Sequence, residues 1–305
     1  MQIDTLKIYC DVVRLRSFSR GAEANGVQQV AATLTVQRLE KRLGVMLIDR
    51  SCRPWQPTRE GQLFYDGCRE MLERFHALEC EVQGGVIATD SVVRVAAIYS
   101  ANLPWMSQCV RRFNELYPQA RVELEFIHPT RVLDRVLNNE VDLGILSFPQ
   151  ERRELMVIPW HNEPMVLACP PRHPLARKVK IAVKQLAGEP FVGFDTDLII
   201  RRKVDGFLRE HGVEVEVVMT SDNIEAIKSA VESGVGVAIL PLPTLERELG
   251  VHTLAAVPFT SGNFVRPLGI IYRRGHRFYP NTRAFIELLQ KGTLQSRRLA
   301  KSKPT

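Results

Sequence analysis

The sequence lacks any long apolar run, and its 305 residues nowhere approach the roughly eighteen consecutive apolar residues that a membrane-spanning helix needs. Its beginning, "MQIDTLKIYCDVVRLRSF", carries acidic side chains and has no apolar block of the kind found in a signal peptide. The apolar share of 45% and the charged share of 25% are ordinary for a folded globular protein. We therefore expect a cytoplasmic protein of two or three domains without a membrane partner.

Cysteine is scarce and scattered. The six cysteines, at positions 10, 52, 68, 80, 109 and 169, form no C-x-x-C pair, and the seven histidines show no metal-ligand spacing. This pattern favours reduced thiols over a disulfide framework or a zinc site, so we expect no metal and no resident cofactor. A redox switch built on Cys109 and Cys169 is an alternative that their wide spacing disfavours.

Enzyme signatures are also missing. The sequence has no G-x-S-x-G, no H-E-x-x-H and no G-x-x-x-x-G-K-[ST], and "GVGVAI" departs from G-x-G-x-x-G at its last glycine. We interpret His128 as a structural or ligand-contacting residue rather than a catalytic base. These absences favour a binding protein over an enzyme.

The net charge of +7 is unevenly distributed along the chain. Residues 1–59 hold ten Lys and Arg against five Asp and Glu, a balance of +5, whereas residues 60–90 hold two against seven, a balance of −5. A basic N-terminal block favours a polyanionic partner. The chain ends on a second basic segment, residues 293–305, which we expect to be a mobile tail.

Three short helical patterns occupy the first sixty residues. The first places apolar residues at helical spacing, namely Leu6, Tyr9, Val12 and Val13. The second runs through "SRGAEANG", with Ser19 as the expected N-cap and Gly26 as the stop. The third lies in "QQVAATLTVQRLEKRLGVMLIDR", residues 28–50, and its apolar residues recur at intervals of four, three and four: Ala32, Val36, Leu39 and Leu43. One face of this third helix is therefore predicted to be buried.

The opposite face of the third helix mixes hydroxyl, amide, guanidinium and small apolar groups. Amides read adenine, arginine reads guanine and methyl groups meet thymine in the major groove of DNA. For a helix considered alone, a solvated surface is the more common explanation of such a face. The helix therefore has to be judged together with the segment that follows it.

That segment, "GVMLIDRSCRPWQPTREG", predicts a short strand, a turn and a new helix capped by Thr58. This is the layout of a winged helix-turn-helix, in which a helix enters the major groove and wing cations meet the phosphates. The predicted DNA-contacting residues are Gln28, Gln29, Val30, Thr33, Leu34, Gln37, Arg38, Arg50, Arg53 and Pro54.

These motifs resemble a known family. "SFSRGAEANGVQQVAATLTVQRLEKRLGVMLIDR" followed by "PTREG" is similar to the N-terminal domain of LysR-type transcriptional regulators, and "VDLGIL" and "SGVGVAILP" match its regulatory domain in order and spacing. The helix-turn-helix residues of the family carry over onto Phe18 to Gln37. The resemblance implies double-stranded DNA, further copies of this chain and RNA polymerase as partners.

The sequence departs from the family pattern within the DNA-binding segment. Residues 28–30 read Gln, Gln and Val where the family usually has Ser, Gln and Pro. Leu34 replaces a frequent Arg or Gln, and Pro57 replaces a usual Leu. These changes do not affect the expected fold, but they leave the operator sequence open.

Residues 59–90 predict a linker helix with an apolar seam about three heptads long, which "GG" at 84–85 ends. The seam consists of Phe64, Cys68, Met71, Phe75, Leu78 and Val82. No partner for it is evident within the chain, so we expect it to pack against the same helix of a second copy, and the resemblance implies the same dimerisation. Two identical DNA-binding domains of a dimer or a tetramer would then bind a pseudo-palindromic site.

Residues 91–292 alternate strand and helix patterns, from "VVRVAAI" to "NTRAFIELLQ", and predict parallel α/β units in two lobes. This organisation resembles the periplasmic-binding-protein-like effector domain of the family. Loops that follow the strands of such folds hold ligands, often beside helix N-termini. The predicted effector-binding residues are Ser100, Asn102, Thr130, Ser147, Thr196, Arg201, Thr220 and Asn223. Helix capping is an equal alternative for any one of them, and only their convergence favours a site.

The sequence thus predicts an all-α winged helix-turn-helix in residues 1–58, the linker helix, and a two-lobed α/β effector domain. The function it favours is a transcription regulator that responds to a small molecule of unknown identity, with its target genes and the sign of regulation open. One alternative is a solute-binding or enzymatic α/β protein whose N-terminus serves assembly, but such a protein has no use for a basic wing. DNA compaction is a further alternative, which the modest basic charge disfavours.

Overall fold

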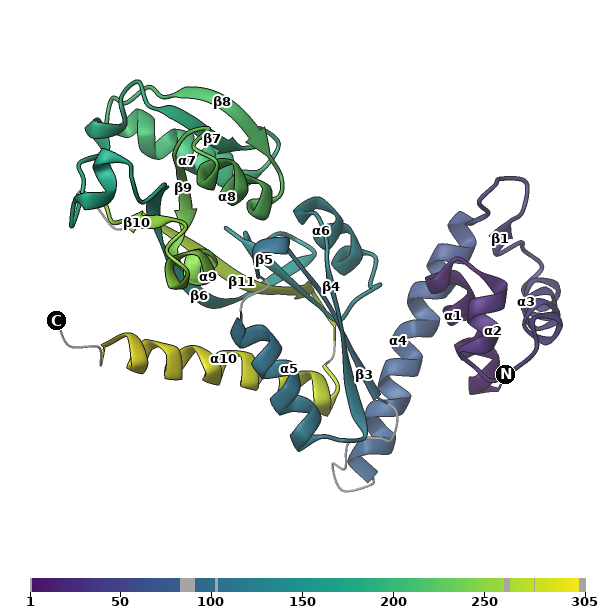
Figure 1. Cartoon of the computed structure of the whole chain (residues 1–305). Coiled ribbons are helices and arrows are strands. Elements are labelled where there is room, and N and C mark those ends of the chain that lie inside the picture. Colours follow the sequence, from purple (N-terminus) through teal and green to yellow (C-terminus); the bar gives the residue numbers. More distant parts are fainter. Residues whose placement is uncertain (1, 83–90, 102–103, 261–263, 277, 302–305) are drawn as a thin grey trace. The chain divides into compact units, whose positions relative to one another are not determined.

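The computed structural model describes residues 2–82, 91–101, 104–260, 264–276 and 278–301 (Figure 1). The chain divides into two compact units, Met1–Ala88 and Thr89–Thr305, and each is described by itself. This division falls two residues before the predicted start of the effector domain.

The N-terminal unit is a winged helix-turn-helix followed by a long helix. It contains α1 (Ile3–Leu15), α2 (Phe18–Glu23), α3 (Gln29–Leu43), the antiparallel wing strands β1 (Ile48–Asp49) and β2 (Gln56–Pro57), and α4 (Arg59–Val82). Its core gathers the inward faces of these helices, including the predicted Leu6, Tyr9, Val12, Val13, Ala32, Val36 and Leu39. The Tyr9 hydroxyl donates to the Gly61 carbonyl at 2.8 Å and so connects α1 to the start of α4. Thr58 caps α4 as predicted, because its Oγ1 accepts the Gly61 N–H at 2.9 Å.

Two local predictions in this unit were wrong. The N-cap of α2 is Ser17 rather than Ser19, since the Ser17 backbone is extended and its side chain accepts the Arg20 N–H. Leu43 is 42% exposed rather than buried. Leu43 is the last residue of α3, whereas Glu40, one turn earlier, is buried and its carboxylate accepts backbone N–H groups of the segment that leads into β1.

Helix α4 carries apolar side chains on two faces rather than along one seam. Cys68 is only 1% exposed and lies in the core of its own unit, and the Phe64 ring packs 5.4 Å from that of Tyr9. Cys68 was therefore wrongly assigned to the dimer seam, whereas the place of the partly buried Phe64 in it stays a prediction. Four other apolar side chains remain exposed along one face of α4 at intervals of four, three and four, and we call them the α4 stripe: Met71, Phe75, Leu78 and Val82. Leu63 is exposed on a different face of the helix.

The C-terminal unit begins with parallel strands and crossover helices, as predicted. Strand β3 (Ser91–Ala97) pairs in parallel with β4 (Ala120–Phe126) and β5 (Leu143–Ser147), and α5 (Pro104–Leu116) and α6 (Pro129–Leu137) connect them. A second parallel pair joins β7 (Pro190–Phe194) to β8 (Glu216–Ser221) through α7 (Ile199–Glu210). The remaining elements are α8 (Ile224–Glu232), β9 (Ala238–Pro241), α9 (Glu246–Gly250), β10 (Ala255–Val257), β11 (Val265–Arg273) and α10 (Pro280–Lys301).

The sheets are mixed rather than purely parallel. Strand β6 (Leu155–Cys169) is longer than the predicted "EPMVLACP" and pairs antiparallel with β11 as far as Pro164. From Met165 onward it pairs antiparallel with β9 and then with β10, which the sequence did not predict. Strand β6 therefore passes from one lobe to the other. The first lobe contains β3–β5, β11 and α5, α6 and α10, and the second contains β7–β10 and α7–α9.

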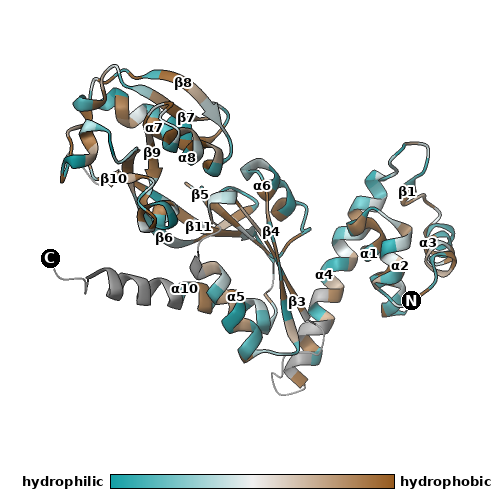
Figure 2. Ribbon diagram, in the orientation of Figure 1, coloured by the Kyte–Doolittle hydropathy of each residue, from teal (hydrophilic) through white to brown (hydrophobic). Residues whose placement is uncertain are grey.

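Each lobe is held by buried aliphatic and aromatic side chains from its strands and helices. In the second lobe these include Leu167, Phe191, Val204, Ile227 and Leu240, all at most 1% exposed. Full burial of one such side chain stabilises a fold by about 1.5–3 kcal/mol. Figure 2 shows the resulting contrast, with brown strands such as β9 and β11 and a largely teal α6.

Helix α10 runs to Lys301, beyond the predicted end of the effector domain at residue 292. Residues 293–301 therefore continue a helix, residues 302–305 lie outside the described part, and the mobility of this tail stays a prediction. Within the described residues, no helix is both long and apolar enough to pass through a membrane.

Candidate nucleic-acid interface and ligand cavity

The outward face of α3 matches the predicted reading face. Ala32, Val36 and Leu39 are at most 3% exposed, whereas Val30 is 67% and Leu34 is 44% exposed. Gln28, Gln29, Gln37 and Arg38 are exposed beside them, and Thr33 is half-buried. The helix therefore presents methyl groups among amides and a guanidinium, which is the mixture that base edges in a major groove can use.

Two hydrogen bonds orient the polar side chains at the start of α3. The Ser19 hydroxyl donates to Gln29 Oε1 at 2.8 Å, so the donor end of the Gln29 amide is the end available for a base. The Thr33 hydroxyl donates to the Gln29 carbonyl at 2.9 Å, within its own helix. Of the two, Gln29 is therefore the better placed to form hydrogen bonds with DNA.

The wing comprises residues 48–57, and its predicted DNA-contacting residues differ in their exposure and in their contacts. Arg53 and Pro54 are exposed. Arg50 has two partners within its unit, because its Nη2 lies 3.5 Å from Glu40 Oε2 and its guanidinium lies 5.6 Å from the centre of the Phe18 ring. The wing also contains an acidic residue, Asp49. Its pKa is lowered mainly by a hydrogen bond from the Ser51 hydroxyl, and further by one from the Ser51 N–H.

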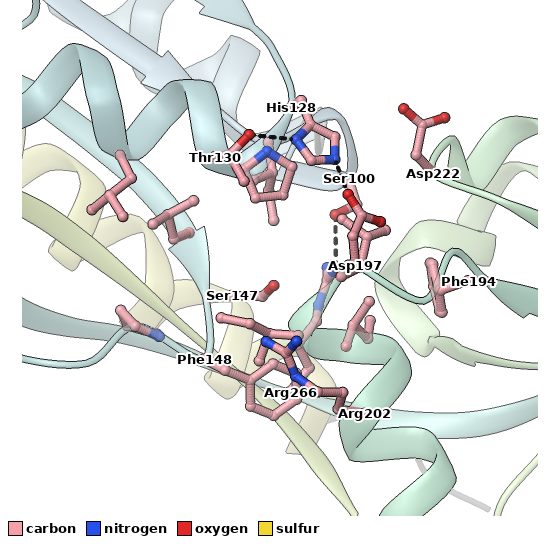
Figure 3. A pocket seen from close by; sticks show the side chains of 18 of the residues that line it. Ser100, His128, Thr130, Ser147, Phe148, Phe194, Asp197, Arg202, Asp222 and Arg266 are labelled. Atoms are coloured by element: carbon pink, nitrogen blue, oxygen red, sulfur yellow. Dashed lines mark hydrogen bonds and ion pairs between the residues drawn. The ribbon is translucent and has the colours of Figure 1, made fainter.

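The C-terminal unit contains a cavity of about 250 Å³ between its two lobes (Figure 3). The first lobe lines it with the ends of β3 and β5 and the start of α6, and the second lobe with the end of β7 and the starts of α7 and α8. Aliphatic and aromatic side chains form most of its wall, among them Ile98, Leu133, Leu146, Phe148, Phe194, Leu198, Ile200 and Ile224. This is the place where loops after strands were predicted to converge.

Three of the predicted effector residues, Ser100, Thr130 and Ser147, line this cavity, and Asn102 lies outside the described residues. The other four do not line it: Thr196, Arg201, Thr220 and Asn223. Thr196 and Thr220 are exposed on the surface of the second lobe.

Hydrogen bonds within the second lobe explain why Arg201 and Asn223 do not line the cavity. Arg201 is turned away from the cavity because its Nε donates to the Asp205 carboxylate at 2.8 and 2.9 Å and its Nη1 to the Phe194 carbonyl. Asn223 caps α8 by accepting the Glu225 N–H, which was the alternative for such residues.

Sequence reasoning missed several cavity residues, above all Phe148, Arg202 and Arg266. Arg202 is one position from the predicted Arg201, so the prediction identified the correct helix, α7, but the wrong face of it. Phe148 has a positive φ of 50°, which is rare for a bulky residue and has no sequence signal. Arg266 lies 166 positions after its partner Ser100, and only its place as a charged residue beginning the apolar strand "RPLGIIYR" could have marked it.

One contact between an imidazole and a carboxylate crosses the cavity between the lobes. His128, at the start of α6, has its Nε2 3.5 Å from Asp197 Oδ2 in the loop before α7. Its Nδ1 lies 2.9 Å from Thr130 Oγ1, which fixes the ring from the other side (Figure 3). His128 therefore serves as a bridge beside the cavity, in keeping with its interpretation as a structural or ligand-contacting residue.

A buried ion pair lies where the chain crosses between the lobes. Glu163 of β6 and Arg266 of β11 are direct cross-strand neighbours, 0% and 1% exposed, and the Arg266 Nε donates to Glu163 Oε2 at 2.7 Å. Arg266 Nη2 donates to the same oxygen, and Nη1 donates to Ser100 Oγ at 2.7 Å. Glu163 Oε1 is buried without a hydrogen-bond partner among the described residues. Arg266 thus connects the crossover strands to the cavity wall.

The cavity combines its apolar wall with a small number of charged side chains and backbone donors. Its charged side chains are mixed in sign, with three arginines and two aspartates: Arg152, Arg202, Arg266, Asp197 and Asp222. The starts of α6 and α7 lack side-chain caps, so their first N–H groups offer donors at the cavity edge. Within the described residues, no group of three or more His, Cys, Asp or Glu is arranged to hold a metal ion.

The two cysteines of the alternative redox hypothesis are both buried. Burial raises the pKa of the Cys109 and Cys169 thiols to about 11 each, and for Cys169 the charge of Glu189 adds to the effect. Such thiols are protonated at neutral pH and react slowly, because the thiolate is the reactive form. This further disfavours a redox switch between them.

Comparisons with known proteins match both units. A family model described as "Bacterial regulatory helix-turn-helix protein, lysR family" matches residues 3–62, and one described as "LysR substrate binding domain" matches residues 88–293. The chain belongs to the LysR family of bacterial transcriptional regulators. It is a LysR-type regulator with an effector-binding domain, which confirms the family, fold class and function predicted from the sequence.

Individual relatives support the same assignment. This LysR-type chain is 30% identical over 297 residues to the "Probable RuBisCO transcriptional regulator" of Synechocystis sp., covering 93% of this chain and 84% of that one. Among solved structures, a full-length OxyR variant from Pseudomonas aeruginosa is 23% identical with a TM-score of 0.78, covering 96% of this chain and 94% of that one. The Synechocystis CcmR regulatory domain in complex with 2-PG is 28% identical with a TM-score of 0.61, covering 67% and 97%.

Proposed function

We propose that this LysR-type regulator binds a pseudo-palindromic promoter site as a dimer or tetramer, and that a small molecule in the inter-lobe cavity changes its affinity for DNA or the geometry of the complex. It acts in the cytoplasm together with RNA polymerase and catalyses no reaction. The observation that carries the proposal is the outward face of α3. Val30 and Leu34 are exposed there among amides, and the basic wing follows directly.

DNA contacts divide between the two elements. Gln29, Gln37 and Arg38 read base edges, and the Val30 and Leu34 side chains meet thymine methyl groups. Arg53, exposed on the wing, meets a phosphate beside the groove. Side chains that contact phosphates set the overall affinity, whereas those that contact bases set the preferred sequence.

Dimerisation rests on the α4 stripe. Val82 is 79% exposed, Leu78 56% and Met71 52%, and their spacing along α4 matches the a and d positions of a coiled coil. An apolar stripe of this length on a helix is stabilised when it packs against an identical copy. A two-fold pair of α4 helices would place two copies of α3 on one DNA site.

The effector we propose is a small organic molecule with an apolar body and one or two polar groups. The wall of the cavity is mostly apolar, which disfavours a sugar or a polyphosphate. Ser100 and the start of α6 offer hydrogen-bond donors for the polar end. The similar CcmR regulatory domain, which was solved in complex with 2-PG, supports a ligand in this domain.

The proposed DNA contact of the wing is tested by replacing Arg53 with glutamine. We expect weaker binding to every duplex alike, because the lost contact is to a phosphate. The slope of log K against log salt concentration should fall by about one, since one fewer counterion is released. Fluorescence anisotropy with labelled duplexes at several salt concentrations measures both quantities. An unchanged slope would contradict the assignment of Arg53 to a phosphate.

The separation of ligand sensing from DNA binding is tested by filling the cavity. We expect Thr130→Trp to abolish the melting-temperature shift that any binding compound, from a metabolite panel including 2-PG, gives with the wild type. Its DNA affinity without ligand should change less than about threefold, because Thr130 lies outside the DNA-binding unit. Thr196→Trp is the matched control, since Thr196 is exposed and does not line the cavity. Equal ligand shifts in both variants would show that the cavity is not the effector site.

A further inference from the structure

Glu40 is a buried carboxylate on the helix proposed to read DNA. It is 7% exposed although α3 lies at the surface of its unit. Its Oε1 accepts two backbone N–H groups, from Leu47 at 3.0 Å and from Ile48 at 3.1 Å, where the chain enters β1. A carboxylate that accepts two amide N–H groups fixes the path of the backbone that carries them. Glu40 therefore determines where the first strand of the wing begins relative to α3.

The second oxygen of Glu40 holds Arg50. Glu40 Oε2 lies 3.5 Å from Arg50 Nη2, and the other side of the guanidinium lies over the ring of Phe18 at 5.6 Å. The Phe18 ring in turn packs 5.4 Å from that of Trp55, which belongs to the wing. Arg50, itself a residue of the wing, is thus held against α3 and α2, and its side chain is only 38% exposed. We call Glu40, Arg50 and Phe18 the wing brace.

We propose that Glu40 is a positioning residue for DNA binding, which acts through Arg50 to hold the wing so that Arg53 reaches a phosphate while α3 lies in the groove. The inference rests on the proposed DNA-binding function. A wing that is fixed before binding has less conformational freedom to lose on the DNA, so the brace raises affinity without touching DNA itself. In this account Arg50 contributes mainly as part of the brace, and Arg53 is the phosphate contact.

The proposal predicts a coupling between residues that do not touch. If the brace positions Arg53, then removing the Arg53 cation matters only while the brace is intact. We expect Arg53→Gln to weaken binding about tenfold in the wild-type background and less than about twofold in a Glu40→Gln or Arg50→Met background. A role of Glu40 in fold stability alone would lower the melting temperature but leave the effect of Arg53→Gln the same in every background.

The experiment is a double-mutant cycle on the full-length protein. Affinities of the single and double variants are measured by fluorescence anisotropy for two 30-base-pair duplexes, one from directly upstream of the protein's gene and one of random sequence, and thermal melting checks folding. Arg50→Met leaves both Glu40 hydrogen bonds to the backbone in place, so it carries the test if Glu40→Gln fails to fold. Arg14→Met is the matched control, because it breaks the Arg14–Asp11 pair of α1, which has no part in the brace.

The outcomes are distinct. Loss of the Arg53→Gln effect in the brace variants, together with its full effect in Arg14→Met, supports the positioning role. An equal Arg53→Gln effect in the wild-type and Arg50→Met backgrounds overturns it. Failure of the folded wild type to bind either duplex overturns the proposed DNA-binding function itself, which is a different result.

Discussion

Replacing Arg266 with methionine is expected to destabilise the C-terminal unit by about 3–5 kcal/mol, because the change leaves the carboxylate of Glu163 buried without its cation. Glu163 is 0% exposed, and one of its oxygens already lacks a hydrogen-bond partner among the described residues. Methionine keeps most of the volume of the arginine stem, so the loss reports the charge rather than a cavity. Urea unfolding followed by circular dichroism measures the difference in unfolding free energy.

The control for this prediction replaces both partners. The double variant Glu163→Leu, Arg266→Met removes the unpaired charge as well, and we expect it to recover most of the lost stability, since apolar pairs often match buried ion pairs. Full stability in Arg266→Met alone would show that Glu163 has another cation or takes up a proton at little cost. Equal losses in the single and double variants would show that the arginine stabilises the crossover through Ser100 instead.

The second large effect is expected from the α4 stripe. Replacing Leu78 with glutamate puts a charge into a surface that we propose to be buried between two copies of α4. The variant should sediment as a monomer at micromolar concentration. Its affinity for the promoter site should fall by about 10²–10⁴-fold, because two linked readers gain this much from binding two half-sites together.

Glu70 provides the control on the same helix. It is exposed on α4 but lies outside the stripe, so Glu70→Gln should leave both the assembly and the DNA affinity within about twofold of the wild type. Analytical ultracentrifugation and anisotropy titrations check the two quantities separately. A Leu78→Glu variant that stays dimeric would place the dimer interface elsewhere.

The sequence predicted the fold well where local patterns determine it. Helix α3 could be found because Ala32, Val36 and Leu39 share one face, and the wing because Arg50, Arg53 and Pro54 fall in a turn between two short strands. Leu43 was misplaced because periodicity alone does not show that α3 ends at this residue, whose side chain is 42% exposed. Periodicity also does not show that Glu40 is buried, because the N–H groups that its carboxylate accepts belong to residues outside the helix.

The cavity was only partly predictable, for a different reason. Ser100, Thr130 and Ser147 could be found because each lies at or just after the end of a strand beside the cavity. Arg266 could not, since it enters the cavity wall from β11, and its contacts to Glu163 and Ser100 span 103 and 166 positions. The predicted seam of α4 was partly wrong for a similar reason, because the burial of its residues depends on contacts with distant parts of the chain. Heptad spacing marks apolar positions, but only the packing of α1 shows that Cys68 is covered within its own unit.

The central claim is that this LysR-type regulator reads a specific DNA site with α3 and its wing. The most direct measurement is a nuclease footprint of the purified full-length protein on the DNA upstream of its gene. The account predicts a protected, pseudo-palindromic region that appears at protein concentrations well below those that protect random DNA, and that a Gln29→Ala, Gln37→Ala variant no longer selects. Uniform protection of all DNA, or protection that the variant retains unchanged, would contradict it.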